Sequence, residues 1–231
     1  MMALVLRCKV ERMNFLAGQF APPWVWGANL VAGLLLLLCA RKVAWRALPE
    51  AAVSAWCGAC VVLLGFALAR AGLQPGLSFH LLGATVFTLL MGPWLAMLAL
   101  SLVLLALAAG GFLDPLALGL NLLLSYAPVV ALTTLVLQLA RRRLAPNLFV
   151  YVFVNAFLTG AAGMLLAACC GLLALGLAGA YAADHLLENA LPFYFLLAWS
   201  EAFTSGLVIA ILIVYRPHWV ATFDDRRYLA G

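Results

Sequence analysis

Residues 77–109 read LSFHLLGATVFTLLMGPWLAMLALSLVLLALAA, a run of 33 residues without a charged side chain. A helix crosses the roughly 30 Å hydrocarbon core of a bilayer with about 20 residues, so this run is too long for one crossing. Gly92, Pro93 and Trp94 lie in its middle, and a proline removes one hydrogen bond from a helix. The pattern predicts two short membrane helices that meet at this break.

The composition of the whole chain agrees with a membrane protein. Of its 231 residues 68% are hydrophobic and only 9% are charged, and the mean hydropathy is +1.14. Soluble domains usually carry about 25% charged residues. These values exclude a soluble globular enzyme, a disordered chain and a nucleic-acid-binding protein. They predict an all-α, polytopic membrane helical bundle.

The remaining apolar runs give the number of spans. Each is bounded by basic residues or by a turn, and the runs are residues 24–40, 51–69, 116–140, 148–180 and 191–215. With the two helices of residues 77–109, we expect about seven transmembrane helices. We divide the chain into an N-terminal extension (1–12), a transmembrane domain (13–217) and a cytoplasmic tail (218–231).

The positions of Lys and Arg predict the orientation. Nine of the 13 basic residues lie in segments 41–46 and 141–143 and in the tail from residue 216, all on one predicted side. Cytoplasmic loops of membrane proteins are enriched in Lys and Arg. We therefore expect the C-terminus in the cytoplasm and the N-terminus outside, in a multi-pass membrane protein.

The N-terminal charges run against this orientation. Arg7, Lys9 and Arg12 would be basic residues on the outer side. If the functional chain begins at Met13, only Arg70 breaks the pattern. Both readings stay open, a start at Met13 and a genuine extension of residues 1–12.

His80 is the first polar side chain with a chemical interpretation, because polar groups are costly inside a bilayer. It stands at the start of the predicted third span. A neutral imidazole there can bind nickel, cobalt, copper or zinc. Alternatively it donates a hydrogen bond to a backbone carbonyl.

Further polar residues lie within the predicted spans. Asn121 and Ser125 share one helix face, and Thr133 and Thr134 follow; these side chains either join helices or support a ligand site. Glu201 lies ten residues inside the last span, where a buried acid needs a partner or a proton. A structural role beside its neighbours and a functional role are both open.

Two other groups invite a metal interpretation but favour a structural one. Cys57 and Cys60 form a lone CxxC inside an apolar helical run, which favours core packing. Asp184, His185 and Glu188 favour a solvated loop, although His and Glu three apart share a helix face. We find no paired base and nucleophile, so the sequence does not indicate an enzyme.

Several motifs together resemble a known family. Residues 76–83 (GLSFHLLG) and 90–94 (LMGPW) are similar to the glycine loop, His-Leu-Leu-Gly and Gly-Pro-Trp of the cobalt- and nickel-type energy-coupling factor (ECF) ABC transporter permeases, the CbiM/NikM-like substrate-capture subunits. Weaker similarities cover four more stretches: residues 13–26, 110–111, 118–121 and 200–202.

The resemblance implies a seven-helix subunit that captures a Ni or Co ion as the transported substrate, and no firm cofactor. In this family the free N-terminal amine, the amide and side chain of the following residue, and a histidine of the third helix hold the ion. The matching positions are Met13, Asn14 and His80, and we expect Asn121 to support them. Family members have histidine where this chain has Asn14.

The resemblance also implies partners. The sequence contains no ATPase motif, so ATP-driven transport needs separate ECF ATPase subunits and a coupling transmembrane subunit. The leading hypothesis is a multi-pass permease or substrate-binding component of the bacterial inner (cytoplasmic) membrane for a divalent transition metal. The alternative, suggested by Asn14, is a non-transporting scaffold or accessory subunit that kept the fold and lost the metal site.

Overall fold

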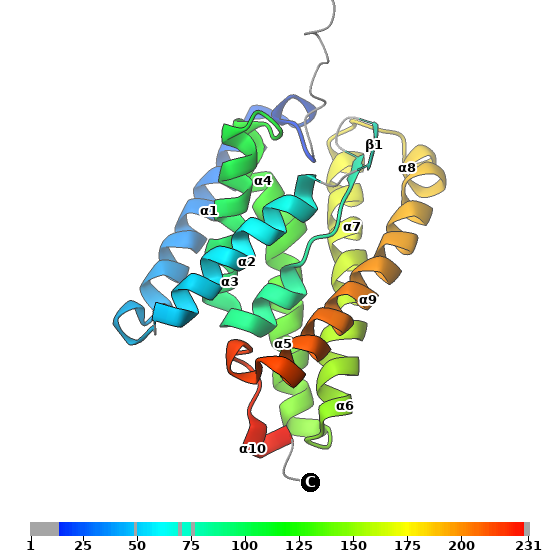
Figure 1. Cartoon of the computed structure of the whole chain (residues 1–231). Coiled ribbons are helices and arrows are strands. Elements are labelled where there is room, and N and C mark those ends of the chain that lie inside the picture. The colour runs from blue at the N-terminus through cyan, green and yellow to red at the C-terminus, as the bar shows by residue number, and fades with distance from the viewer. Residues whose placement is uncertain (1–13, 49, 69–70, 75–76, 229–231) are drawn as a thin grey trace, which may run out of the picture.

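The computed structural model of the chain describes residues 14–48, 50–68, 71–74 and 77–228. Its long helices are packed as a bundle (Figure 1). They are α1 (Pro22–Lys42), α2 (Glu50–Leu68), α3 (Ala84–Ala109), α5 (Ala127–Arg143), α7 (Thr159–Leu177) and α9 (Leu191–Tyr215). Five described helical stretches are long and apolar enough to cross a membrane, and Val53–Leu68 is a shorter apolar helix. The predicted all-α polytopic bundle is confirmed.

Shorter elements complete the described chain. Single helical turns or short helices are η1 (Ala17–Gln19), η2 (Trp45–Ala47), η3 (Pro115–Ala117), α4 (Leu118–Asn121), α6 (Leu148–Val150), α8 (Ala183–Asn189), η6 (Pro217–Trp219) and α10 (Asp225–Tyr228). Two π-helical segments, η4 (Leu122–Tyr126) and η5 (Tyr151–Leu158), continue directly into α5 and α7. Because of this continuity, the predicted long spans around residues 116–140 and 148–180 are each one unbroken helical stretch.

The sequence explains where several helices begin and end. α1 and α9 begin with proline in the first turn, where the missing N–H costs nothing. α1 ends at Arg41 and Lys42, and α5 ends at a run of three arginines. Basic side chains at the last turn interact favourably with the negative end of the helix dipole.

Two predictions about local structure need correction. Strands β1 (Ala71–Gln74) and β2 (Leu77–Phe79) pair antiparallel between the apolar runs 51–69 and 77–109, where no strand was predicted. The segment Tyr181 to Asn189 was expected to be a loop, and most of it is helix α8. Both elements lie at the end of the bundle that holds residues 14–21 (Figure 1).

The apolar run 77–109 contains the predicted break. Gly92 has φ +76° and ψ 167°, far from helical geometry, in the middle of α3. Only glycine adopts such a conformation without steric cost. The first helix of the pair is shorter than predicted, because the chain stays extended until Gly83 and becomes helical at Ala84. We name the two parts before the break the extended segment (77–83) and the half-helix (84–91).

The run 77–109 crosses the bundle twice. Leu77 packs in one cluster with Phe15 at the N-terminal end of the bundle. Leu89 accepts a hydrogen bond from the backbone of Thr222 at the opposite end. After the break the chain returns, and Asp114 accepts a hydrogen bond from the N–H of Ala17. Among the described residues five helical stretches have membrane-spanning length and Val53–Leu68 is a shorter apolar helix, and the number of about seven transmembrane helices stays a prediction.

Charge is distributed unevenly between the two ends of the bundle. Every described Lys and Arg lies at the end that holds the C-terminal segment, and we call it the basic end. These residues are Arg41, Lys42, Arg46, Arg141, Arg142, Arg143, Arg216, Arg226 and Arg227. The predicted clustering of nine basic residues on one side is confirmed.

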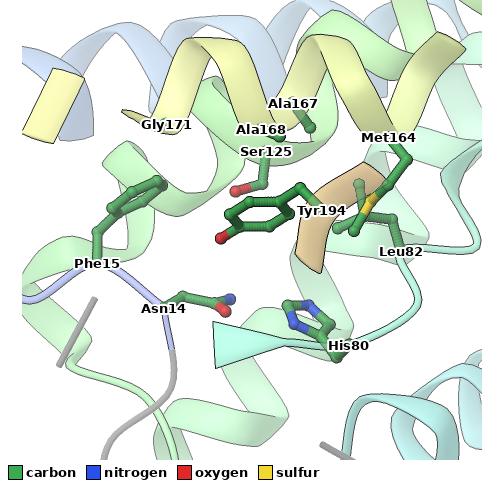
Figure 2. A pocket seen from close by; sticks show the side chains of 10 residues that line it. All are labelled: Asn14, Phe15, His80, Leu82, Ser125, Met164, Ala167, Ala168, Gly171 and Tyr194. Atoms are coloured by element: carbon green, nitrogen blue, oxygen red, sulfur yellow. The ribbon is translucent and has the colours of Figure 1, made fainter. Parts of the chain in front are cut away.

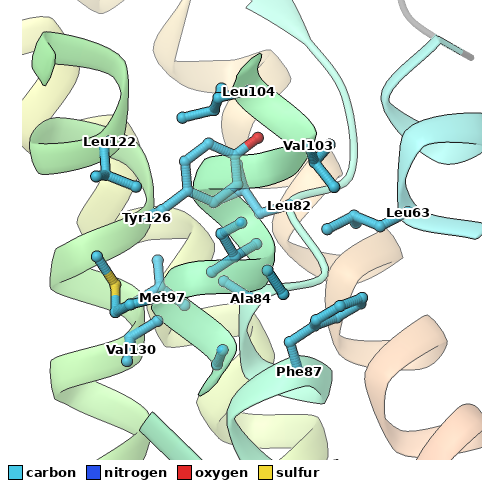
Figure 3. Packing of buried hydrophobic residues seen from close by; sticks show 14 of the residues in the cluster. Leu63, Leu82, Ala84, Phe87, Met97, Val103, Leu104, Leu122, Tyr126 and Val130 are labelled. Atoms are coloured by element: carbon cyan, nitrogen blue, oxygen red, sulfur yellow. The ribbon is translucent and has the colours of Figure 1, made fainter. Parts of the chain in front are cut away.

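The largest apolar core surrounds the half-helix. Ala84 and Phe87 of the half-helix pack with Leu63 of α2, and Met97 and Tyr126 belong to the same cluster (Figure 3). Trp56 of α2 also donates a hydrogen bond from Nε1 to the carbonyl of Leu95 at 3.3 Å. The half-helix is therefore enclosed by protein rather than lipid.

Candidate metal-capture site

His80 lies on the extended segment, not on a helix. Its side chain is buried, with 6% of its surface exposed. The Nε2 atom is 3.3 Å from the hydroxyl of Tyr126, which belongs to the π-helical segment η4. Backbone without helical hydrogen bonds is tolerated at membrane depth only where protein encloses it. The extended segment therefore presents the His80 imidazole inside the bundle from backbone that is not helical.

Asn14 is held beside it by an unusual backbone. It has φ +57°, and it is the one described non-glycine residue with a positive φ. Asparagine adopts this left-handed conformation more readily than most residues. The Asn14 side chain is buried, and Figure 2 shows it projecting into the same space as the His80 ring. Residues 66 positions apart in sequence thus meet at one site.

Asn121 fixes the backbone next to Asn14. Its Oδ1 accepts a hydrogen bond from the N–H of Phe15 at 3.1 Å, and its Nδ2 donates to the carbonyl of Phe15 at 3.2 Å. Nδ2 also donates to the carbonyl of Ala117 at 2.8 Å. Asn121 has no exposed surface, so this pairing is made inside the protein. The predicted supporting position is thus occupied by a side chain that holds the Phe15 backbone.

A small cavity lies between these residues (Figure 2). Its volume is about 30 Å³, and its walls come from the N-terminal segment, the extended segment, η4, α7 and α9. Such a volume accommodates one water molecule or one ion. The lining residues are Asn14, Phe15, His80, Leu82, Ser125, Met164, Ala167, Ala168, Gly171 and Tyr194.

Gly171 of α7 provides the space for the N-terminal segment. A Cβ atom at this position would lie 2.7 Å from Cζ of Phe15. No real side chain tolerates such a contact, so the Phe15 ring needs the glycine. The ring also packs edge-on against Phe20 with centroids 6.0 Å apart. This packing, with the bonds of Asn121, fixes the position of Asn14 at the cavity.

Glu201 of α9 anchors the other side of the site. Its carboxylate accepts hydrogen bonds from the N–H of Leu82 at 2.9 Å and from the N–H of Gly83 at 2.8 Å. Gly83 has φ +62°, and the half-helix starts directly after it. A carboxylate is stabilising at a helix N-terminus, where the first N–H groups lack partners. Glu201 therefore fixes the extended segment two residues after His80.

Other predicted candidates lie away from the cavity. Within the described residues no three His, Cys, Asp or Glu side chains group to hold a metal. His185 stacks on Tyr181 and interacts with Asn189 at 3.3 Å. Cys57 and Cys60 are free cysteines on α2. Met13 lies outside the described residues.

The interhelical interpretation of Thr133 is supported by its geometry. Its Oγ1 lies 3.3 Å from Oγ1 of Thr85, so α5 and α3 are joined by a buried hydroxyl pair. Thr134 instead donates to the carbonyl of Val130 in its own helix. Sequence reasoning missed Tyr126 and Tyr194, whose hydroxyl groups approach the site from runs of apolar residues. Aromatic residues in such runs give no sign of a polar role.

The fold and this cavity define a class: a polytopic helical membrane protein that encloses a site for one small solute near one end of the bundle. Residues 14–219 match the family model of the cobalt uptake substrate-specific transmembrane region (CbiM), and the chain belongs to this family. It is thus a substrate-specific membrane component of a metal transporter, as the sequence motifs predicted.

Two solved structures share the fold. One is described as a crystal structure of a truncated transition metal transporter; it has 20% sequence identity and a TM-score of 0.77, over 88% of this chain and 99% of that chain. The other, described as a transition metal transporter, has 20% identity and a TM-score of 0.76, over 87% and 92% of the two chains. No curated protein matches the sequence significantly.

Proposed function

We propose that this protein captures a single divalent cobalt or nickel ion at the cavity between Asn14 and His80. The observation that carries this proposal is the pair itself: a buried imidazole and a buried amide line a space of about 30 Å³. The size of the space fits one ion. The ion is the transported substrate, and no chemical turnover is assigned to the protein.

The ligand chemistry favours a late first-row metal. Imidazole nitrogen suits nickel, copper, cobalt and zinc, whereas oxygen-rich sites suit magnesium and calcium. We assign His80 as the principal side-chain ligand, with Asn14 and the Met13 amine as further ligands. Asn121 acts on these ligands indirectly, because it holds the backbone of Phe15.

We further propose the setting in which the subunit works. The basic end faces the cytoplasm, because Lys and Arg accumulate on that side of membrane proteins. The site near residue 14 then opens to the outside of a bacterial inner membrane. The energy for uptake comes from separate ECF ATPase subunits through a coupling membrane subunit.

The proposal is tested by titrating the detergent-purified protein with Co²⁺ and with Ni²⁺. We compare the full chain, a version that begins at Met13, and the His80→Ala variant. His218→Ala is the matched control, because His218 lies exposed at the basic end. We expect stoichiometric binding that weakens at least about 100-fold in His80→Ala and is unchanged in His218→Ala.

Two other results would contradict the proposal. Binding that is equally strong in His80→Ala would place the metal elsewhere. If the wild-type protein binds neither metal in either version, but Asn14→His gains binding, the chain is the non-transporting relative that has lost its site.

A further inference from the structure

The C-terminal segment, residues 217–228, is packed onto the basic end of the bundle. Val220 and Tyr228 are buried, with 1% and 5% of their surfaces exposed. They share a core cluster with Leu89 of the half-helix and Tyr151 of η5. A segment rich in polar residues is thus anchored by its few apolar side chains.

This segment supplies the hydrogen bonds that the broken helix lacks. In an α-helix the carbonyl of Leu89 would accept from the N–H of residue 93, but Pro93 has none. Here the Leu89 carbonyl accepts from Oγ1 of Thr222 at 2.6 Å and from the Thr222 N–H at 3.3 Å. The neighbouring Leu90 carbonyl accepts from the N–H of Ala221 at 2.9 Å.

Thr222 is also held in place by two further elements, η5 and α5. The hydroxyl of Tyr151 lies 2.6 Å from Oγ1 of Thr222. Arg141 at the end of α5 donates to the carbonyl of Thr222, and Arg227 in turn donates to the carbonyl of Arg141. Tyr151 also contacts the rings of Phe223 and Tyr228, with centroids 5.0 Å and 4.9 Å away. The contacts join the segment to α3, α5 and η5 at one point.

We propose that residues 217–228 form a plug that closes the basic end beneath the half-helix, and that the captured ion leaves toward this end only when the plug is displaced. Thr222 is the positioning residue. Its hydroxyl donates to the Leu89 carbonyl of the half-helix, and Tyr151 and Arg141 hold it there through contacts with its hydroxyl and its carbonyl. His218, Trp219, Ala221, Asp224, Arg226 and Arg227 of this segment are exposed, so the segment lies at the surface and its displacement does not require the long helices to separate. The proposed release of the ion rests on the proposed metal transport. The proposed closure of the basic end by residues 217–228 does not depend on it.

The closure is tested by chemical labelling, without metal. A reporter cysteine replaces Leu90 in a full chain whose six native cysteines are changed to alanine. A membrane-impermeant maleimide is applied to inside-out vesicles. We expect slow labelling in the parent and about tenfold faster labelling when Thr222→Val and Tyr151→Phe remove the hydroxyl contacts.

The control for labelling is Thr134→Val, which removes a hydroxyl bonded within α5. It should leave the rate unchanged. Equal labelling in the parent and in the Thr222→Val, Tyr151→Phe protein would overturn the plug. If that double variant does not elute as a folded monodisperse protein, Tyr151→Phe alone is used, with the same expected direction.

The release step is tested by locking the plug. Cysteines at Leu90 and Ala221 are joined with a short thiol-specific cross-linker that dithiothreitol reverses, in cells that take up radioactive cobalt. We expect uptake to fall at least about tenfold while locked and to recover on reduction, with Co²⁺ affinity changed less than about twofold.

The outcomes separate the two proposals. Uptake that continues in the locked protein would overturn the release step. Absence of Co²⁺ and Ni²⁺ binding in the unlocked protein would refute the proposed function and with it the release step, while the labelling experiment still decides whether the plug closes the basic end.

Discussion

The two ends of the half-helix are stabilised by opposite chemistry. At its N-terminal end, backbone N–H groups of Leu82 and Gly83 donate to the Glu201 carboxylate. At its C-terminal end, the carbonyls of Leu89 and Leu90 accept from the C-terminal segment. Every helix leaves N–H groups unpaired at one end and carbonyls at the other. A broken helix inside a bundle therefore needs an acceptor at its start and donors at its end.

The groups that bond to the two ends of the half-helix differ in how deeply they are buried. Glu201 is buried within α9, and 2% of its surface is exposed. Ala221 and Thr222 belong to a terminal segment at the surface of the basic end, where Ala221 is exposed and Thr222 is half-buried. We therefore infer that the end near His80 is fixed, whereas the end at the basic end of the bundle can be released. This asymmetry is useful to a protein that must hold an ion and then deliver it.

The largest predicted effect comes from Glu201→Ala. It leaves one buried N–H group (Leu82) and one part-buried N–H group (Gly83) without an acceptor, and a buried one costs about 1–3 kcal/mol. We expect a strongly lowered thermal midpoint in detergent and weaker Co²⁺ binding, because the segment that carries His80 loses its anchor. Thermal unfolding and metal titration measure the two effects.

Two further variants separate positioning from general destabilisation. Glu201→Gln keeps one acceptor oxygen and should recover part of both losses. Glu188→Ala removes an exposed acid of α8 and should change neither. If Glu201→Ala binds Co²⁺ with wild-type affinity, Glu201 does not position His80.

A smaller effect is expected at the joint between the extended segment and the half-helix. In Gly83→Ala the new Cβ would lie 2.7 Å from Cδ1 of Leu63, and the residue would keep φ +62°. Left-handed backbone costs an alanine about 1–2 kcal/mol, and the clash adds to it. The free energy of unfolding should fall by about 2–4 kcal/mol, measured by denaturation in mixed micelles.

Gly58→Ala is the matched control on the neighbouring helix. A Cβ there meets no atom within 4 Å, and alanine favours helix over glycine by about 1 kcal/mol. We therefore expect no loss of stability. Equal destabilisation by both substitutions would mean that the conformation of Gly83 has no special importance.

The smallest effect is predicted at the basic end. Thr222→Val removes the hydroxyl contacts with the Leu89 carbonyl and the Tyr151 hydroxyl but keeps the Thr222 N–H on Leu89, so we expect a loss of about 1–3 kcal/mol. The same unfolding assay measures it, with Thr134→Val as control. A loss as large as that of Glu201→Ala would contradict the proposed difference between a fixed and a releasable end.

Much of the fold is predictable because its causes are local. The break follows from Gly92 and Pro93, which act on their own backbone wherever they occur. The passes follow from apolar runs bounded by charges. Asn121 could be singled out because an amide inside a membrane span needs partners.

The missed features depend on contacts between distant residues. Nothing within residues 77–83 shows that they are extended, since their stabilising partner Glu201 lies 118 residues from Gly83. The docking of residues 217–228 onto the bundle could not be predicted from the sequence either. The segment bonds to the backbone carbonyls of Leu89 and Leu90. Because every residue has such a carbonyl, the side chains at positions 89 and 90 do not indicate that this segment binds there.

The most direct test of metal capture is X-ray absorption spectroscopy at the metal edge of the Co²⁺-loaded or Ni²⁺-loaded protein. The account predicts scattering from one imidazole ring in the ligand shell, absent in His80→Ala and doubled in Asn14→His. A shell of oxygen atoms alone, unchanged by His80→Ala, would contradict it.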